Sequence, residues 1–196
     1  MELNKQEEKK LLRKEIKSIK SNYSENEFLL KSEIIFNSFE NLIFSTKYSH
    51  IMAYWSLADE VYTHQWIEQH YKQKNIFLPV IQDDEIKVKA FSGVENMQTV
   101  PPFGIKEPIG KEIKDLDQIE IILVPGMAFD RMGYRMGRGK GYYDRFLPKT
   151  SAIRIGICFD FQLFNQIPIN EYDAKMDYII TEKEIITINK KRLSQN

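Results

Sequence analysis

The stretch Ile119-Glu-Ile-Ile-Leu-Val-Pro-Gly126 is followed, seven residues later, by Gly133-Tyr-Arg-Met-Gly-Arg-Gly-Lys-Gly-Tyr-Tyr-Asp144. The first run is apolar, rich in β-branched residues and closed by Pro-Gly, which predicts a buried strand that ends in a loop. The second holds four glycines, two arginines and a lysine, and a helix is predicted to begin within 142–147. Glycine tolerates positive φ, so loop amides can approach an anion closely, and a helix N-terminus adds partial positive charge. This strand, loop and helix indicate bound phosphate.

Neither common phosphate-binding pattern fits the loop. A P-loop requires Ser or Thr after its lysine, whereas Gly141 follows Lys140. The dinucleotide fingerprint begins at Gly137 and Gly139, but Tyr142 stands at the third glycine. The sequence therefore supports neither a Walker-type ATPase nor a Rossmann dehydrogenase. A basic surface loop whose glycines only form turns is the simpler alternative. The cations and the aspartate that flank these glycines weigh against it.

The rest of the chain predicts an α/β fold. Helical periodicity covers about 2–20, where Leu12, Ile16 and Ile19 share a face and lysines cover the remainder, and about 24–44, where Ser24 and Glu27 form a capping box. We expect strands at 50–55, 76–81, 86–91, 119–124, 152–159 and 178–181, and a helix at 62–74. Proline and glycine between 93 and 110 predict a long connection without regular structure.

These elements predict one domain over residues 1–196, with a helical segment at about 2–44 and an α/β core at about 48–188. The alternation of strands and helices favours a mostly parallel sheet with helices on both faces. Ligands of such sheets bind beyond the carboxyl ends of the strands, which is where the glycine loop begins.

Composition limits the partners. The chain of 196 residues carries 28 basic and 28 acidic side chains, so no overall field draws it to nucleic acid or to an anionic membrane. Its one cysteine, Cys158, lies in an apolar run and cannot form an internal disulfide. No apolar run approaches the ~18–20 residues that span a bilayer, and the first twenty residues are densely charged. We expect a cytoplasmic monomer that binds neither nucleic acid nor membrane.

The motif resembles a known family. Val124-Pro-Gly-Met-Ala-Phe-Asp130, Gly133 and Arg135-Met-Gly-Arg-Gly-Lys-Gly-Tyr-Tyr-Asp144 are similar, almost residue for residue, to the signature of the 5-formyltetrahydrofolate cyclo-ligases, also called methenyltetrahydrofolate synthetases. Weaker similarity extends from about Lys9 to Asp177. The resemblance implies ATP-dependent closure of 5-formyltetrahydrofolate to 5,10-methenyltetrahydrofolate, with release of ADP and phosphate. ATP is then a co-substrate, Mg²⁺ is the metal, and Arg138 and Lys140 act on the transferring phosphoryl group.

The resemblance also implies how ATP is bound. Lys9 and Arg13 match the family's N-terminal Lys-x-x-x-Arg element, although Lys10 and Lys14 offer a second register. Four-residue spacing places each such pair on one helix face, and a merely solvated basic face is the alternative. The ATP-binding residues implied in the loop are Arg135, Gly137, Arg138, Gly139, Lys140, Gly141, Tyr142 and Tyr143.

For the folate, the resemblance implies an apolar residue and a glutamate five positions later, which are Trp55 and Glu60 here. Trp55 departs from the aliphatic residue that the family favours. An aromatic ring can stack on a pterin and a carboxylate can accept from its donor edge. The start of an acidic helix is the alternative for this segment. The loop residues implied to contact folate are Arg138, Gly139, Lys140, Gly141 and Tyr142.

For magnesium, the resemblance implies Asp144 and Asp177, and Asp173 competes with Asp177 for the second position. Magnesium commonly takes one or two protein carboxylates, and phosphate oxygens and waters complete its octahedron. Roles as loop or cap residues are the alternative for both aspartates. The three histidines do not share a face that would suit a transition metal, and we assign them no role.

Two other classes of function stay open. One is a nucleic-acid-binding module, in which cations contact phosphates and Tyr142 and Tyr143 stack on bases. Its cations are Arg131, Arg135, Arg138, Lys140 and Arg145. The other is a folate-binding paralogue without turnover, for which the motif gives no sign because Lys140 and Asp144 both match the family pattern.

Overall fold

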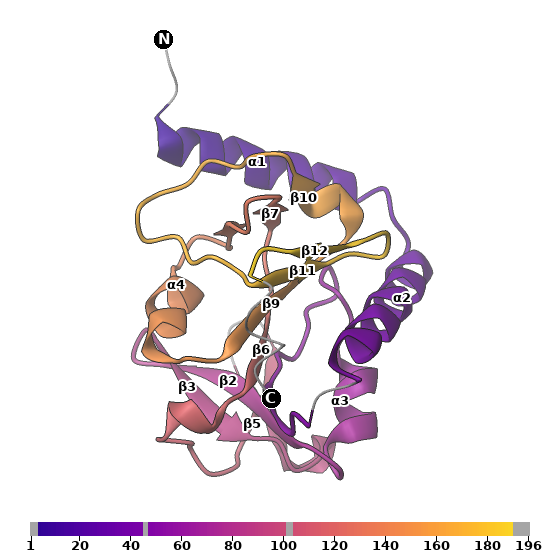
Figure 1. Cartoon of the computed structure of the whole chain (residues 1–196), viewed down its shortest axis with the longest axis vertical. Helices are drawn as coiled ribbons and strands as arrows, with labels where there is room; N and C mark the ends of the chain where they lie inside the picture. The colour runs from indigo at the N-terminus through magenta and orange to yellow at the C-terminus, as the bar shows by residue number, and fades with distance from the viewer. Residues whose placement is uncertain (1–3, 45–46, 101–103, 190–196) are drawn as a thin grey trace.

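The predicted central strand is β6, in the middle of a mostly parallel sheet (Figure 1). The computed structural model describes residues 4–44, 47–100 and 104–189, and within these ranges the main sheet has seven strands. From one edge to the other they are β12 (Ile185–Thr187), β11 (Tyr178–Ile180), β9 (Ile153–Ile157), β6 (Ile121–Val124), β1 (His50–Met52), β2 (Asn75–Gln82) and β3 (Glu85–Ala90). The five inner strands are parallel, and β12 and β3 are antiparallel to their neighbours. The predicted α/β class is confirmed.

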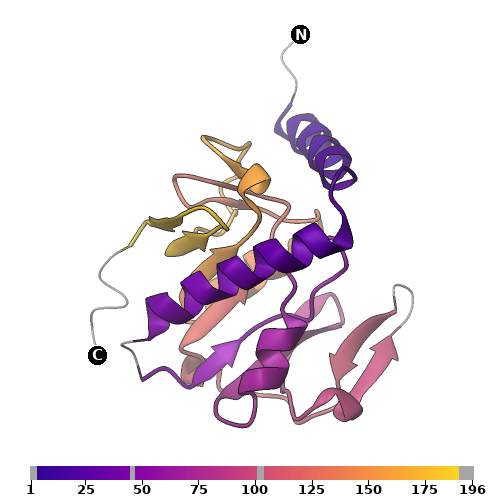
Figure 2. The same cartoon turned by 90° about the vertical axis from the view of Figure 1, so that its right-hand side faces the viewer.

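Helices cover both faces of this sheet because its strands are apolar on both sides. Ile121 and Leu123 of β6 belong to the cluster that packs under α2 (Glu25–Ile43) and α3 (His64–His70). Ile122 and Val124 belong to the opposite cluster, with Phe146 of α4 (Tyr142–Phe146). Figure 2 shows α2 lying across one face of the sheet. No described helix combines the length and the hydropathy that spanning a bilayer requires.

The two N-terminal helices begin where the sequence predicts. Ser24 caps α2, and its side chain and that of Glu27 form the expected capping box. Asn4 and Glu7 form a second capping box at the start of α1 (Lys5–Lys20). The prediction that lysines cover only the outer face of α1 is wrong, because Lys9 and Lys20 are buried together with Ile16. The one-domain organisation over 1–196 stays a prediction.

A small second sheet lies under α1 and carries the glycine loop. It consists of β10 (Leu163–Phe164), β7 (Ala128–Asp130) and β8 (Arg135–Met136), none of which the sequence predicts. Ile16 packs against Met127, Ala128 and Met136 of this layer. The buried Gln162 amide donates to the Gly126 and Met127 carbonyls at 3.0 and 2.9 Å. The turn after β6 is therefore fixed before the loop begins.

The segment 93–110 differs from the predicted irregular connection. It contains a hairpin of β4 (Met97–Val100) and β5 (Ile105–Pro108), which projects from the body in Figure 2. Pro101 and Pro102 lie outside the described residues. The predicted helix at 62–74 is wrong in length, since α3 covers only His64–His70. Single 3-10 turns are η1 (Val94–Asn96), η2 (Leu116–Gln118), η3 (Leu147–Lys149) and η4 (Asp160–Gln162).

The strand order reverses between β1 and β6. From β1 the chain continues to β2 and β3 on one side, whereas β6, β9 and β11 lie on the other. The loops after two neighbouring parallel strands therefore leave the same edge in opposite directions, which opens a binding crevice at this point in α/β sheets. The loop after β1 holds Trp55 and Glu60, and the loops after β6 hold the glycine segment.

Close packing beside β9 gives a test of the core. A Cβ on Gly156 would lie 2.5 Å from Cε1 of Phe129, which is fully buried. We expect Gly156→Ala to lower the free energy of unfolding by about 1–3 kcal/mol, as overpacking does. Urea unfolding measures it, with Phe129→Leu as the control background. If the alanine costs as much in the Phe129→Leu background as in the wild type, the contact is not the cause.

Candidate active site

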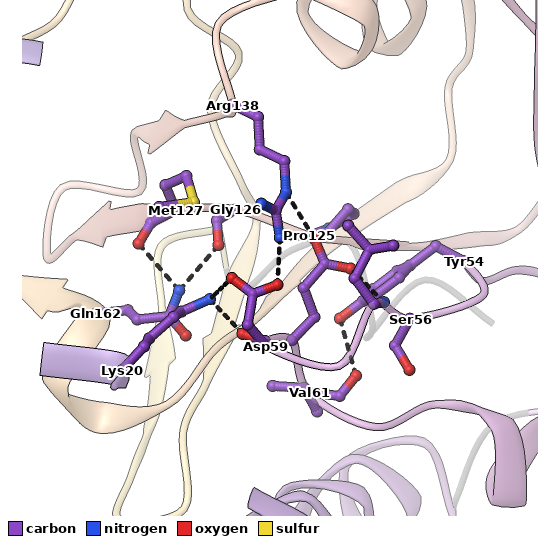
Figure 3. Close-up of polar contacts among 12 residues, drawn as sticks. Lys20, Tyr54, Ser56, Asp59, Val61, Pro125, Gly126, Met127, Arg138 and Gln162 are labelled. Atoms are coloured by element: carbon purple, nitrogen blue, oxygen red, sulfur yellow. Dashed lines mark hydrogen bonds and ion pairs between the residues drawn. The ribbon is translucent and has the colours of Figure 1, made fainter. Parts of the chain in front are cut away.

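The two loops at the switch point meet through Arg138. Its guanidinium donates two hydrogen bonds to Oε1 of Glu60, from Nε at 3.2 Å and from Nη2 at 3.0 Å. Nη2 also donates to Oδ1 of Asp59 at 2.6 Å. Figure 3 shows Arg138 pointing from its loop onto Asp59. Glu60 is fixed further, because its other oxygen accepts from the Leu57 amide at 3.0 Å. A residue predicted to bind ATP thus lies beside one predicted to bind folate.

Helix α1 touches three segments of the site with one face. Lys9, Arg13 and Lys20 recur at helical spacing, so their side chains project together. Lys9 pairs with Asp173, Arg13 donates from Nε to the Gly137 carbonyl at 3.0 Å, and Lys20 binds Asp59. Arg13 thus lies against the glycine loop, and its expected contact with ATP stays a prediction. Lys9, only 5% exposed, is held by a carboxylate and lies away from solvent.

The loop has the backbone that its glycines predict. Gly139 and Gly141 adopt φ of +109° and +68°, in the region that L side chains rarely enter. Gly139 faces Arg13, whose guanidinium would lie 3.6 Å from a Cβ there. The following helix α4 has only five residues, so a helix dipole adds little to anion binding here.

Lys140 is the available cation of the loop. Its side chain is exposed, and within the described residues its ammonium has no carboxylate or hydrogen-bond partner. Its carbonyl accepts from Arg145 at 2.9 Å, which holds the backbone in place. Arg135 differs, because it is buried, donates to the Pro125 carbonyl and pairs with Asp144 at 3.0 Å. Lys140 can therefore meet a ligand, whereas Arg135 supports the loop from below.

The two tyrosines after the loop face different ways. The Tyr142 hydroxyl donates to Asp84 at 3.3 Å in the turn between β2 and β3. Tyr143 lies under Arg135, with 5.4 Å between the guanidinium carbon and the ring centroid. Its buried hydroxyl has no hydrogen-bond partner among the described residues, and burial raises its pKa. Such a buried hydroxyl without a partner is uncommon in folded proteins.

A cavity of about 640 Å³ lies between α1 and Arg138. Five of the eight residues that line it are basic: Lys10, Arg13, Lys14, Lys17 and Arg138; the others are Glu7, Leu11 and Met127. Lys10 and Lys14 line this cavity, whereas Lys9 does not. Lys10 and Lys14, the second register of the Lys-x-x-x-Arg element, therefore both line the cavity. Of the first register, Lys9 and Arg13, only Arg13 lines it.

Trp55 stands in an aromatic stack. Its ring centroid lies 3.8 Å from that of His64 with 13° between the planes, and 5.8 Å from that of Phe91. His64 Nε2 lies 3.1 Å from the Ser56 carbonyl, which holds the imidazole. Burial lowers the pKa of His64 from 6.5 to about 4; the bond to Ser56 opposes the shift and Lys106 adds to it. The wall beside Trp55 is therefore uncharged near neutral pH.

The metal candidates differ in how much of each carboxylate is free. Asp144 accepts from Arg135 and from the Ala174 amide with Oδ1 alone. Asp177 is 8% exposed, and its oxygens accept from the Arg154 amide at 2.9 Å and from Asn189 at 3.3 Å. Asp173 binds Lys9 and the Asn170 amide with Oδ2. No three His, Cys, Asp or Glu side chains cluster within the described ranges. Asp144 and Asp173 therefore each keep one carboxylate oxygen available for a metal ion. Asp177 instead bonds the backbone of β9 and so links this strand to the segment before β11.

The cations of the nucleic-acid alternative do not form an open basic surface. Arg131 pairs with Glu184 through two bonds of 3.1 and 2.6 Å, and Arg145 donates to the Lys140 and Asp84 carbonyls. Arg135 is buried and Arg138 bonds two carboxylates. Four of the five named cations thus have protein partners, and no described observation favours a phosphate backbone.

Fold and loop together define an α/β protein with a glycine-rich basic loop at the carboxyl edge of a mostly parallel sheet. Over residues 5–182 the chain matches the 5-formyltetrahydrofolate cyclo-ligase family, and it belongs to that family. This confirms the resemblance carried by the glycine loop.

Solved structures and curated relatives agree with this membership. The NMR structure of the Aquifex aeolicus 5,10-methenyltetrahydrofolate synthetase is 31% identical, covers 92% of each chain and superposes with a TM-score of 0.82. The Mycoplasma pneumoniae 5,10-methenyltetrahydrofolate synthetase is 25% identical over 89% of this chain and 98% of its own, with a TM-score of 0.70. A probable 5-formyltetrahydrofolate cyclo-ligase of Caenorhabditis elegans is 28% identical over 197 residues, or 92% of this chain and 95% of its own.

Sequence reasoning missed three residues of the site. His64 received no role, yet it stacks on Trp55. Asp59 and Lys20 received no role either, yet the two bind each other. The spacing of Lys9, Arg13, Ile16 and Lys20 on one helix face was the available signal.

The depressed pKa of His64 predicts how stability depends on pH. Below pH 6.5 His64 is protonated in the unfolded chain, whereas in the folded protein it stays neutral down to about pH 4. The free energy of unfolding therefore decreases as the pH falls from about 6.5 to about 4. His64→Phe keeps a stacked ring and removes the titration. Urea unfolding at pH 7.5 and 5 should show a larger loss in the wild type than in the variant. An equal loss of stability in the wild type and the variant, or a His64 imidazole that titrates near pH 6.5 by NMR, contradicts the prediction.

Proposed function

We propose that this protein catalyses the ATP-dependent closure of 5-formyltetrahydrofolate to 5,10-methenyltetrahydrofolate. The observation that carries the proposal is the contact of Arg138 with Glu60, because it joins the loop expected to bind phosphate to the loop expected to bind folate. A ring closure driven by phosphoryl transfer requires both substrates to meet at one point. The names of the related proteins support the same reaction.

The nucleotide phosphates lie in the cavity between α1 and the loop. Arg13 and Arg138 line it, with Lys10 and Lys14 along the same helix. Lys140 supplies a further charge from the loop, where Gly137, Gly139 and Gly141 bring the backbone close. These cations suit a triphosphate, which carries several negative charges that must be neutralised before transfer. Lys9 contributes indirectly, since it holds Asp173 and anchors the helix.

The folate lies against Trp55 and Glu60. The indole is held by His64 and Phe91 and offers a rigid face to a planar ring. Glu60 is part-buried and oriented by the Leu57 amide, so its carboxylate can accept from ring donors once Arg138 turns to the phosphates. The exposed Arg138 side chain has room for that movement.

The chemistry follows from this placement. The 5-formyl oxygen attacks the γ-phosphorus, the bond to ADP breaks, and the formyl carbon becomes electrophilic. N10 then attacks this carbon, phosphate leaves with the former formyl oxygen, and N10 gives up its proton. Arg138 and Lys140 neutralise the charge on the transferring phosphoryl group, and no protein nucleophile is required. Tyr143 and Trp55 wall the site and limit the access of water to the activated carbon.

Magnesium fits this site with Asp144 as its protein ligand. The ion supplies charge neutralisation on the phosphate oxygens when it is bound. Oδ2 of Asp144 accepts no hydrogen bond within the described part of the chain, and one carboxylate is sufficient where phosphates and waters complete the shell. For Asp177 a metal-binding role stays a prediction, since both its oxygens hold protein groups. The monomeric state and the cytoplasmic location also stay predictions.

The direct test mixes the purified protein with 5-formyltetrahydrofolate and MgATP and follows the methenyl chromophore. We expect product only with ATP and metal present, and none with EDTA. Lys140→Met should lower kcat by about 100- to 1000-fold, as loss of a charge-stabilising group does. Lys5→Met, on the exposed end of α1, is the control. Folded protein that forms no product, or near-normal turnover by Lys140→Met, contradicts the proposal or the role of Lys140, respectively.

The cavity predicts a separate effect on the nucleotide. Lys10→Gln and Lys14→Gln should each raise KM for MgATP about two- to five-fold, because an exposed charge pair contributes about 1 kcal/mol or less. KM for the folate should stay within about two-fold of wild type. Steady-state kinetics at two ionic strengths measures both values. If the variant that carries both substitutions has an unchanged KM for MgATP, the phosphates do not bind in this cavity.

A further inference from the structure

We propose that Lys20 is a positioning residue for the folate half of the site, acting through Asp59. The inference rests on the proposed function, because it assigns Glu60 and Arg138 to the two substrates. Lys20 is the last residue of α1, and Asp59 precedes Glu60 in the loop after β1. Figure 3 shows Lys20 and Arg138 both pointing toward Asp59 from different sides.

The contacts of Lys20 restrain both the backbone and the side chain of Asp59. Its ammonium donates to the Asp59 carbonyl and lies 3.1 Å from Oδ2. Lys20 is 5% exposed, so its ammonium depends on these oxygens for the hydrogen bonds that water would otherwise make. One lysine therefore fixes the turn from which Glu60 projects.

Lys20 also determines how the hydrogen bonds of Arg138 are divided between Asp59 and Glu60. Asp59 gives Oδ2 to Lys20 and Oδ1 to Arg138, and Arg138 gives two further bonds to Glu60. The four side chains carry two positive and two negative charges. Without Lys20, the carboxylates of Asp59 and Glu60 would compete for one guanidinium, and Asp59 would draw Arg138 away from Glu60. Lys20 thus keeps the Asp59 carboxylate from taking Arg138 away from Glu60.

The charge states agree with this geometry. Burial alone would raise the pKa of Asp59, but Lys20 and Arg138 outweigh burial and hold it below its ordinary value. Burial lowers the pKa of Lys20, and Asp59 opposes that shift. The charged groups facing Lys20 are Asp59, Glu60 and Arg138. Asp59 is therefore ionised at neutral pH, and its carboxylate favours the charged form of Lys20.

Helix α1 makes this role specific to the folate side. Arg13, on the same face, holds the glycine loop through the Gly137 carbonyl. Lys9, equally buried at 5%, pairs with Asp173 near the other end of the helix. Lys9 and Lys20 are thus matched in burial, charge and type of partner. They differ in which segment they hold.

The test measures KM and kcat for both substrates, and the Kd of 5-formyltetrahydrofolate by calorimetry, in Lys20→Met, Lys20→Arg and Lys9→Met. We expect Lys20→Met to raise Kd and KM for the folate about ten-fold or more, with KM for MgATP within about two-fold of wild type. Lys20→Arg keeps the charge and several donors and should recover most of the folate affinity. Lys9→Met loses a comparable buried pair and should leave the folate Kd within about two-fold.

Equal effects of Lys9→Met and Lys20→Met on the folate Kd would overturn the inference, because Lys20 would then only anchor the helix. Unchanged folate affinity in Lys20→Met would overturn it as well. Should Lys20→Met not fold, Asp59→Asn tests the pair from its exposed side and should also weaken folate binding. Wild-type protein that binds the folate without turnover rejects the proposed reaction but leaves the calorimetric comparison decisive. Wild-type protein that binds no folate contradicts both.

Discussion

Two lysine ammonium groups are buried on one face of α1, and each requires oxygen partners that water no longer supplies. Lys9 finds them in Asp173 and Lys20 in Asp59, while Arg13 between them binds the Gly137 carbonyl. A wrong partner would leave a charge buried without compensation, which costs several kcal/mol. The helix can therefore dock in one register only. That register brings together the loop after β1, the glycine loop and the segment before β11.

The sheet provides the frame on which this docking acts. Loops after the neighbouring parallel strands β1 and β6 leave the same edge, and the small sheet under α1 returns the glycine segment toward the first loop. Arg138 then spans the gap to Glu60. Because Arg138 is neutralised by carboxylates, the free charge at the site is left to Lys140 and to the exposed lysines of α1. In the proposed function, folate bound at Glu60 would release Arg138 to the phosphates.

Local patterns in the sequence were sufficient for the fold class and for the backbone of the glycine loop. The β-branched run at 121–124, the capping box at Ser24 and the glycines at positive φ all depend on neighbours in the sequence. Partners distant in the sequence were not predictable in this way. Lys9 and Asp173 are 164 residues apart and Lys20 and Asp59 are 39 apart, so the sequence did not show that these two lysines of α1 are buried. The β4–β5 hairpin is instead a local pairing, which the prolines and glycines of 93–110 did not indicate.

A crystal structure with 5-formyltetrahydrofolate, magnesium and a non-hydrolysable ATP analogue tests the central claim most directly, because it locates both ligands relative to α1. The account predicts the triphosphate between Arg13 and Lys140, the folate ring against Trp55, and Arg138 moved from Glu60 toward the phosphates, while Lys20 keeps its bond to Asp59. A nucleotide bound away from α1, or a folate ring that contacts neither Trp55 nor Glu60, would contradict it.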